Sequence, residues 1–213
     1  MFSKNEILEI FRILEKEFVF DKTELDYFNQ YQLLVAIMLS AQANDASVNK
    51  ATKHLFTILK TPQNAIKLGV NKLNDEIKTI NYHNNKAKNI VKMSEQVISQ
   101  FNNKIPNNFK DLISLAGVGR KTANLFLSIV YDTNNIAVDT HVFRTTNRIG
   151  IVNATNVLQT EMQLIKNVPK NKQKEINSLF IQFGRKYCKA IKPKCNNCPL
   201  KHLCKKYKLN NNK

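Results

Sequence analysis

The pattern of hydrophobic and polar positions predicts an almost entirely helical chain. Apolar residues recur every three or four positions, the period of an amphipathic helix, and no sustained alternation indicates a sheet. Only five glycines and five prolines are present, which is little turn material for an all-β fold. The later predicted helices cover residues 71–80, 86–101, 109–115, 121–131, 140–149, 156–166 and 173–183.

Local signals refine the first half of the chain. Ser3 and Glu6 form an S-x-x-E capping box, which predicts the start of a helix. Residues 31–40 are apolar on every side, as expected for a central buried helix. Asp45 is the predicted N-cap of the next helix. We expect the tail beyond Cys204 to be frayed.

The charge indicates a polyanionic partner. The chain has 33 Lys+Arg against 16 Asp+Glu, a formal net charge of +17, and no acidic residue after Glu175. A solvated basic face without a partner is one alternative. An anionic membrane is another, but no Trp-bearing surface helix supports it. No apolar run reaches the roughly 18 residues that span a bilayer, and the charged first residues resemble no secretion signal. We therefore expect a cytoplasmic protein that binds nucleic acid.

All four cysteines lie near the end of the sequence with the spacing C-x6-C-x2-C-x5-C. Four thiols in one short segment of a cytosolic chain indicate a metal site, because disulfides are rare there. Structural zinc usually uses two short knuckles, whereas only one two-residue gap occurs here. The spacing favours an iron–sulfur cluster over zinc or two disulfides. The predicted ligands are Cys188, Cys195, Cys198 and Cys204.

Two of the five glycines fall within three residues, in Leu115-Ala116-Gly117-Val118-Gly119-Arg120-Lys121. This segment separates two apolar helices, so it predicts a hairpin with backbone N–H groups at the N-terminus of the second helix. Such a site suits one DNA phosphate, bound without reading the base. An ordinary turn between helices with a glycine C-cap is the alternative.

These motifs resemble those of the endonuclease III group of DNA glycosylases. LAGVGRKTA resembles the helix-hairpin-helix of that group, and the cysteine spacing matches its 4Fe-4S loop. The segments LSAQANDASVNKA (39–51) and AVDTHVFR (137–144) are also similar. The resemblance implies an all-α, two-lobed fold. Residues 23–132 would form a six-helix barrel with the hairpin at about 108–128, and 1–22 with 133–213 a discontinuous domain with the cluster loop (188–204).

The resemblance also implies a reaction. Family members remove oxidised pyrimidines from duplex DNA and cut the strand by β-elimination through a lysine Schiff base. The family nucleophile falls on Lys121 and its carboxylate partner on Asp139. A carboxylate can stabilise the positive charge of an oxocarbenium-like sugar. Lys121 could instead only clamp a phosphate, and Asp139 could cap the helix 140–149; both roles can coexist.

Further residues map onto the DNA contacts of the family. Gln42 would fill the gap left by the extruded base, and Tyr82 would act as a second wedge. The loop reads Asn-Tyr-His where relatives commonly show Gly-Leu-Tyr, and Ala116 replaces a common proline. His141 is either a contact of the extruded nucleotide or a helix-surface residue. The predicted DNA-binding set is Gln42, Tyr82, Gly117, Val118, Gly119, Arg120 and Lys192.

The resulting prediction is a monomeric, nucleoid-associated enzyme that acts on double-stranded DNA with damaged pyrimidines or abasic sites. Two alternatives stay open. A mismatch adenine glycosylase shares the hairpin and the cysteine spacing, but that branch lacks the lysine found here as Lys121. A non-enzymatic zinc-dependent DNA-binding module would share the charge and the cysteines without the reaction.

Overall fold

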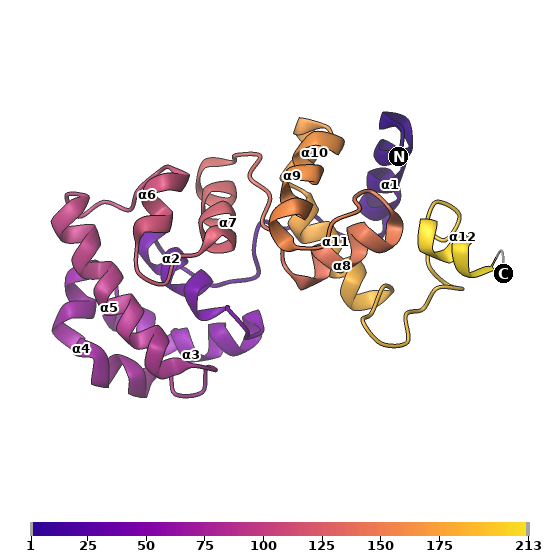
Figure 1. The fold of residues 1–213 in the computed structure, drawn as a ribbon. Helices are drawn as coiled ribbons and strands as arrows, with labels where there is room; N and C mark the ends of the chain where they lie inside the picture. Colours follow the sequence, from indigo (N-terminus) through magenta and orange to yellow (C-terminus); the bar gives the residue numbers. More distant parts are fainter. Residues whose placement is uncertain (1, 212–213) are drawn as a thin grey trace. The chain divides into compact units, whose positions relative to one another are not determined.

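A computed structural model describes residues 2–211, in which every element of regular secondary structure is a helix and no strand occurs. The all-α prediction is therefore confirmed. The chain divides into two compact units (Figure 1). The central unit is Thr23–Tyr131, and the terminal unit combines Met1–Lys22 with Asp132–Lys213.

The central unit is organised around helix α2. Every residue of α2 from Tyr31 to Leu39 is buried, which confirms the prediction for this segment. Its core is completed by apolar side chains of the surrounding helices, such as Leu55, Ile90 and Phe126. The helices of this unit are α2 (Gln30–Leu39), α3 (Asp45–Ile58), α4 (Pro62–Glu76), α5 (His83–Gln100), α6 (Phe109–Ser114) and α7 (Arg120–Tyr131).

One polar residue is buried within α2. Gln32 is 1% exposed, and its side-chain amide donates to the carbonyl oxygens of Phe56 and Leu59, at 2.8 and 3.0 Å. Its carbonyl oxygen accepts from the Phe28 N–H at 3.0 Å. The last carbonyls of a helix have no partner within that helix. Gln32 thus supplies the partners that the buried end of α3 requires.

The terminal unit is built from both ends of the sequence. The predicted Ser3–Glu6 capping box is present at the start of α1. The apolar face of α1 packs into a core with α11, where the Phe11 and Phe180 rings meet edge to face at 5.8 Å. The helices of this unit are α1 (Lys4–Glu17), α8 (Thr140–Ile149), α9 (Val157–Asn167), α10 (Lys170–Gln173), α11 (Ile176–Lys186) and α12 (Lys205–Asn211).

Charged groups fasten α1 to residues more than 150 positions later. Lys172 donates to Glu15 at 2.5 Å, and the Tyr187 hydroxyl donates to Glu17 at 2.6 Å. Lys186 also pairs with Glu17. These hydrogen bonds hold the pKa of Glu17 below its ordinary value, because they favour the carboxylate.

In the terminal unit, as at Gln32, a buried glutamine bonds the last carbonyl groups of a helix. Gln173 is 7% exposed and donates to the carbonyl oxygens of Ile165 and Val168, both at 3.0 Å. These carbonyls belong to the end of α9. In each unit, a buried glutamine therefore satisfies the C-terminal end of a neighbouring helix.

Several predicted helix boundaries were wrong. Asn44, not Asp45, caps α3, and its side chain accepts from the Ser47 N–H at 2.8 Å. Helix α4 begins at Pro62, and a left-handed Gly69 (φ 71°) interrupts it, which breaks the apolar period. The segment 173–183 is divided between α10 and α11. The tail expected to fray forms α12 as far as Asn211.

Among the residues that the structure describes, no helix is both long and apolar enough to cross a membrane.

Candidate functional site

The predicted hairpin is present in the central unit, where a short turn joins α6 to α7. The Val118 N–H donates to the Leu115 carbonyl at 3.1 Å and closes the turn. The Val118 side chain is 5% exposed and belongs to the core. Both groups of Val118 that could meet DNA are thus engaged within the protein.

The turn is tight because α5 supports it from behind. Gly117 has φ 75°, a left-handed conformation that residues with a Cβ rarely adopt. A Cβ there would lie 2.8 Å from the Asn89 Cβ and 2.9 Å from the Met38 Cε. Gln96 holds the adjoining backbone, because it donates to the Ser114 carbonyl at 3.1 Å and accepts from the Ala116 N–H at 2.7 Å.

The far side of the hairpin is available to an anion. In the described part of the chain, the N–H groups of Gly117 and Gly119 have no hydrogen-bond acceptor. They adjoin the first turn of α7, where N–H groups point along the helix axis and favour negative charge. The Arg120 guanidinium lies 4.8 Å from the centre of the Phe109 ring. Lys121 follows, exposed in the same first turn.

The two predicted wedge residues lie on neighbouring loops of the central unit. Gln42 is on the 40–44 loop between α2 and α3, and Tyr82 is on the 77–82 loop between α4 and α5. The Asn81 side-chain amide donates to the Gln42 carbonyl at 2.9 Å. The structure therefore brings the loops together. We call them the insertion loops.

The backbone of the predicted DNA contacts is unusual. Six non-glycine residues in the described range have positive φ, and three are the asparagines and aspartate that tolerate it, Asn102, Asn103 and Asp132. The other three are Gln42 (57°), Tyr82 (59°) and Lys192 (49°). Each was predicted to contact DNA. Strained backbone of this kind is concentrated at functional sites.

The predicted carboxylate lies in the terminal unit. Asp139 is the N-cap of α8, and its Oδ1 accepts from the Val142 N–H at 2.8 Å. The capping role is therefore confirmed. Within residues 2–211, the other carboxylate oxygen of Asp139 accepts no hydrogen bond. Nearby, the His141 Nδ1 is 3.1 Å from a guanidinium nitrogen of Arg144, which places His141 in a side-chain pair.

Two arginines of α8 organise the cysteine segment. Arg144 donates to the Cys188 carbonyl at 3.0 Å, and Arg148 donates to the carbonyls of Lys189 and Ala190 at 2.7 and 3.1 Å. Arg148 also approaches the Cys188 sulfur at 3.8 Å. Lys192 follows in this segment, exposed.

The four thiols are reduced and influence one another electrostatically. Burial, together with the charges of the other three cysteines, raises the pKa of Cys198 to about 11, and burial also raises the pKa of Cys204. Bound metal stabilises thiolates that would otherwise be protonated. Among the described residues, no three His, Cys, Asp or Glu side chains lie close enough to hold a single metal ion.

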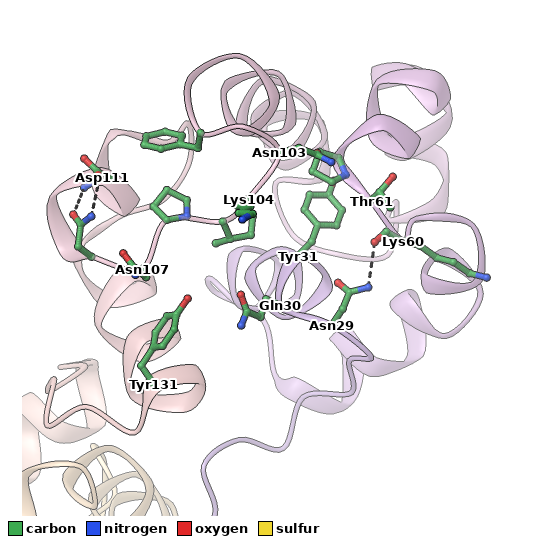
Figure 2. A pocket seen from close by; sticks show the side chains of 15 residues that line it. Asn29, Gln30, Tyr31, Lys60, Thr61, Asn103, Lys104, Asn107, Asp111 and Tyr131 are labelled. Atoms are coloured by element: carbon green, nitrogen blue, oxygen red, sulfur yellow. Dashed lines mark hydrogen bonds between the residues drawn. The ribbon is translucent and has the colours of Figure 1, made fainter.

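A separate pocket of about 700 Å³ opens in the central unit. Figure 2 shows its polar lining, including Asn29, Tyr31 and Lys104, with the Asn29 amide bonded to the Lys60 carbonyl at 3.1 Å. Its lining contains none of the predicted site residues. The hairpin and the insertion loops, not this pocket, therefore form the candidate site of the unit.

Lys86, whose side chain bonds to the residues at the start of the first insertion loop, was not predicted from the sequence. Lys86 is buried, and its ammonium donates to the carbonyls of Leu39 and Ala41 at 2.8 and 2.6 Å. A signal was present, because Lys86 is in helical register with the apolar residues Ile90 and Met93. A lysine in the apolar stripe of a helix predicts a buried ammonium with specific partners.

Comparison with known families defines the class of protein. The family model described as "HhH-GPD superfamily base excision DNA repair protein" matches residues 35–170, more than half of the chain. That range contains the hairpin, Lys121 and Asp139.

Curated relatives narrow this class. "Endonuclease III" of Rickettsia prowazekii is 44% identical over 93% of this chain and 94% of its own length. The protein of the same name from Buchnera aphidicola subsp. Schizaphis graminum is 42% identical over 95% and 97%. The chain belongs to the endonuclease III family of base excision DNA repair enzymes, which confirms the resemblance.

Solved structures share the fold. "Structure of a Trapped Endonuclease III-DNA Covalent Intermediate: Estranged-Adenine Complex" matches with a TM-score of 0.92 and 39% identity, and it covers 99% of both chains. "Structure of a non-covalent Endonuclease III-DNA Complex" has the same TM-score and identity and covers 100% of both. A thermostable thymine-DNA glycosylase, 21% identical with a TM-score of 0.82, shares the fold alone.

The tight packing of Gly117 generates a stability prediction. We expect Gly117→Ala to lower the free energy of unfolding by about 2 kcal/mol or more, because it adds left-handed strain to the contacts with Asn89 and Met38. Gly119→Ala is the matched control: its Cβ would meet nothing within 4 Å, so we expect a change below about 0.5 kcal/mol. Denaturant unfolding measures both, and equal effects would contradict the packing argument.

Proposed function

We propose that this protein removes oxidised pyrimidines from duplex DNA and then cuts the strand at the resulting abasic site. The observation that carries this proposal is an exposed lysine, Lys121, on the first turn after an anion-binding hairpin. A phosphate held by the Gly117 and Gly119 N–H groups would fix the DNA backbone beside that amine. Membership of the endonuclease III family supports the same reaction.

Lys121 is the proposed nucleophile. Its neutral amine attacks C1′ of the damaged nucleotide, a C–N bond forms, and the bond from C1′ to the base breaks. Ring opening converts the adduct to a Schiff base. The positive iminium then takes up the electrons released when a C2′ proton leaves, and the 3′ phosphate departs by β-elimination. Water as nucleophile would leave no such electron sink, so an amine accounts for strand cleavage.

Asp139 is the proposed carboxylate partner. Breaking the glycosidic bond develops positive charge on the sugar, which a nearby carboxylate stabilises. The Val142 N–H occupies Oδ1 and fixes the orientation of the side chain. The other oxygen would face the sugar, so the capping bond is part of the preorganisation of the catalytic group.

Base extrusion is assigned to the insertion loops. A base inside the stack is out of reach, so the nucleotide must rotate out of the duplex, at a cost of a few kcal/mol. Gln42 would fill the vacated space, and the 64% exposed Tyr82 would stack between bases. Arg120 and Lys192 would bind phosphates. The Val118 side chain and N–H are already engaged, so the backbone groups of the two glycines carry the hairpin contact.

A 4Fe-4S cluster bound by Cys188, Cys195, Cys198 and Cys204 is the proposed cofactor. Each cysteine of such a cluster binds a different iron atom, so the sulfurs need not converge on one point. The cluster would neutralise the mutual repulsion of four thiolates. Its role is structural: together with Arg148, it holds the basic segment around Lys192 in shape.

The first prediction concerns the nucleophile. We expect Lys121→Gln to abolish the covalent adduct that borohydride traps on abasic duplex DNA, because an amide forms no Schiff base. Lys110→Gln is the matched control, since Lys110 is an exposed lysine on the other helix of the hairpin. Denaturing electrophoresis of the trapped complex measures both. A Lys121→Gln protein that still cross-links would refute this assignment.

The second prediction separates the two roles of Asp139. Asparagine also caps helices, so we expect Asp139→Asn to change the free energy of unfolding by less than about 1 kcal/mol. Base release in a single turnover should fall at least about a hundredfold, because the negative charge is lost. Asp139→Ala should show the same catalytic loss together with weaker folding. If Asp139→Asn retained wild-type activity, the catalytic role would be refuted and only the helix-capping role of Asp139 would remain.

The third prediction concerns the cofactor. Protein purified without oxygen should show visible absorbance and contain about four iron and about four sulfide ions per chain. Cys195→Ser should reduce that content, because it removes one ligand. Elemental analysis distinguishes the alternatives: one zinc ion per colourless chain would overturn the cluster assignment.

A further inference from the structure

Lys86 is a buried cation that forms no ion pair with a carboxylate within residues 2–211. It is 9% exposed, and burial lowers its pKa because the charged form loses hydration. The partners of the ammonium are the carbonyl oxygens of Leu39 and Ala41. Leu39 ends α2, so the ammonium sits at the negative end of that helix. Carbonyl oxygens and the helix dipole compensate the charge.

These two contacts fix the first insertion loop. Leu39 and Ala41 lie three positions and one position before Gln42. The left-handed backbone of Gln42 is unfavourable for a residue with a Cβ. The Asn81 amide holds the Gln42 carbonyl from the other side. The peptide groups on both sides of the strained Gln42 are therefore held. Lys86 bonds the Ala41 carbonyl before it, and Asn81 bonds the carbonyl of Gln42 itself.

Lys86 also belongs to the second insertion loop. Its backbone N–H donates to the Tyr82 carbonyl at 3.1 Å, the first hydrogen bond of α5. Tyr82 is the left-handed N-cap of that helix. One residue is therefore bonded to both loops, through its backbone to Tyr82 and through its side chain to the residues before Gln42.

We propose, on the basis of the function proposed above, that Lys86 is a positioning residue that couples the insertion loops and fixes the spacing at which Gln42 and Tyr82 enter DNA. The ammonium touches no reacting atom. It holds the loops in their strained conformations before DNA binds, so ordering them costs little during base extrusion. This role distinguishes duplex substrates from single strands, in which no base has to leave a paired stack.

The test compares these two substrates. Lys86→Met keeps the apolar length of the side chain and removes the donors. We expect it to slow base release from a duplex with an oxidised pyrimidine by about tenfold or more, since misplacing a group by ~1 Å can cost about a hundredfold in rate. It should also diminish the fluorescence rise of a 2-aminopurine beside the lesion, which reports unstacking. Borohydride trapping on a single-stranded abasic oligonucleotide should be nearly unchanged.

Two further variants sharpen the result. Lys88→Met removes the same charge from an exposed position of α5, so both rates should equal those of the wild type. Asn81→Ala removes the other anchor from an exposed residue and should reproduce the selective loss even where Lys86→Met folds poorly. Equal losses on duplex and single strand, or no loss on either, would overturn the coupling. A wild-type protein that neither releases bases nor forms a trapped adduct would instead refute the proposed function.

Discussion

A helix that ends inside a protein must find partners for its last carbonyl groups, and the shape of both units depends on meeting that demand. Long polar side chains from other segments meet it. Gln32 satisfies the end of α3, Gln173 the end of α9, and Lys86 the end of α2. Unpaired buried carbonyls would cost ~1–3 kcal/mol each, so these residues stabilise the buried ends of neighbouring helices. At the end of α2, the Lys86 ammonium also bonds the Ala41 carbonyl and so holds the first insertion loop.

Packing is linked to the proposed function through the backbone conformation of three exposed residues that were predicted to contact DNA. Gln42, Tyr82 and Lys192 adopt left-handed conformations that glutamine, tyrosine and lysine rarely adopt. Such conformations persist only where the surroundings enforce them. At Gln42, the Asn81 amide donates to the Gln42 carbonyl and the Lys86 ammonium donates to the preceding Ala41 carbonyl. At Tyr82, the carbonyl accepts from the backbone N–H of Lys86. If these residues contact DNA as proposed, folding energy holds their backbone in place before DNA binds.

Much of this could be predicted from the sequence, because the strongest signals are local. The Ser3–Glu6 capping box, the buried α2 and the bounds 140–149 of α8 follow from spacing and were confirmed. The resemblance to endonuclease III was confirmed as well. Contacts made in three dimensions could not be predicted. The periodicity does not show that the Lys86 ammonium donates to the Ala41 carbonyl, or that the Val118 N–H bonds within the hairpin turn. The roles of Lys121 and Asp139 stay predictions, since they depend on bound DNA.

The discontinuity of the terminal unit has a consequence for biosynthesis. Helix α1 emerges from the ribosome before its partners Lys172 and Tyr187, which lie 157 and 170 positions after the glutamates they bind. At ~5–20 residues per second, α1 therefore waits about 10 to 30 s with its apolar face uncovered. The central unit is one continuous segment, Thr23–Tyr131, so all of it is synthesised within that interval. During that interval the uncovered apolar face of α1 is open to aggregation and proteolysis.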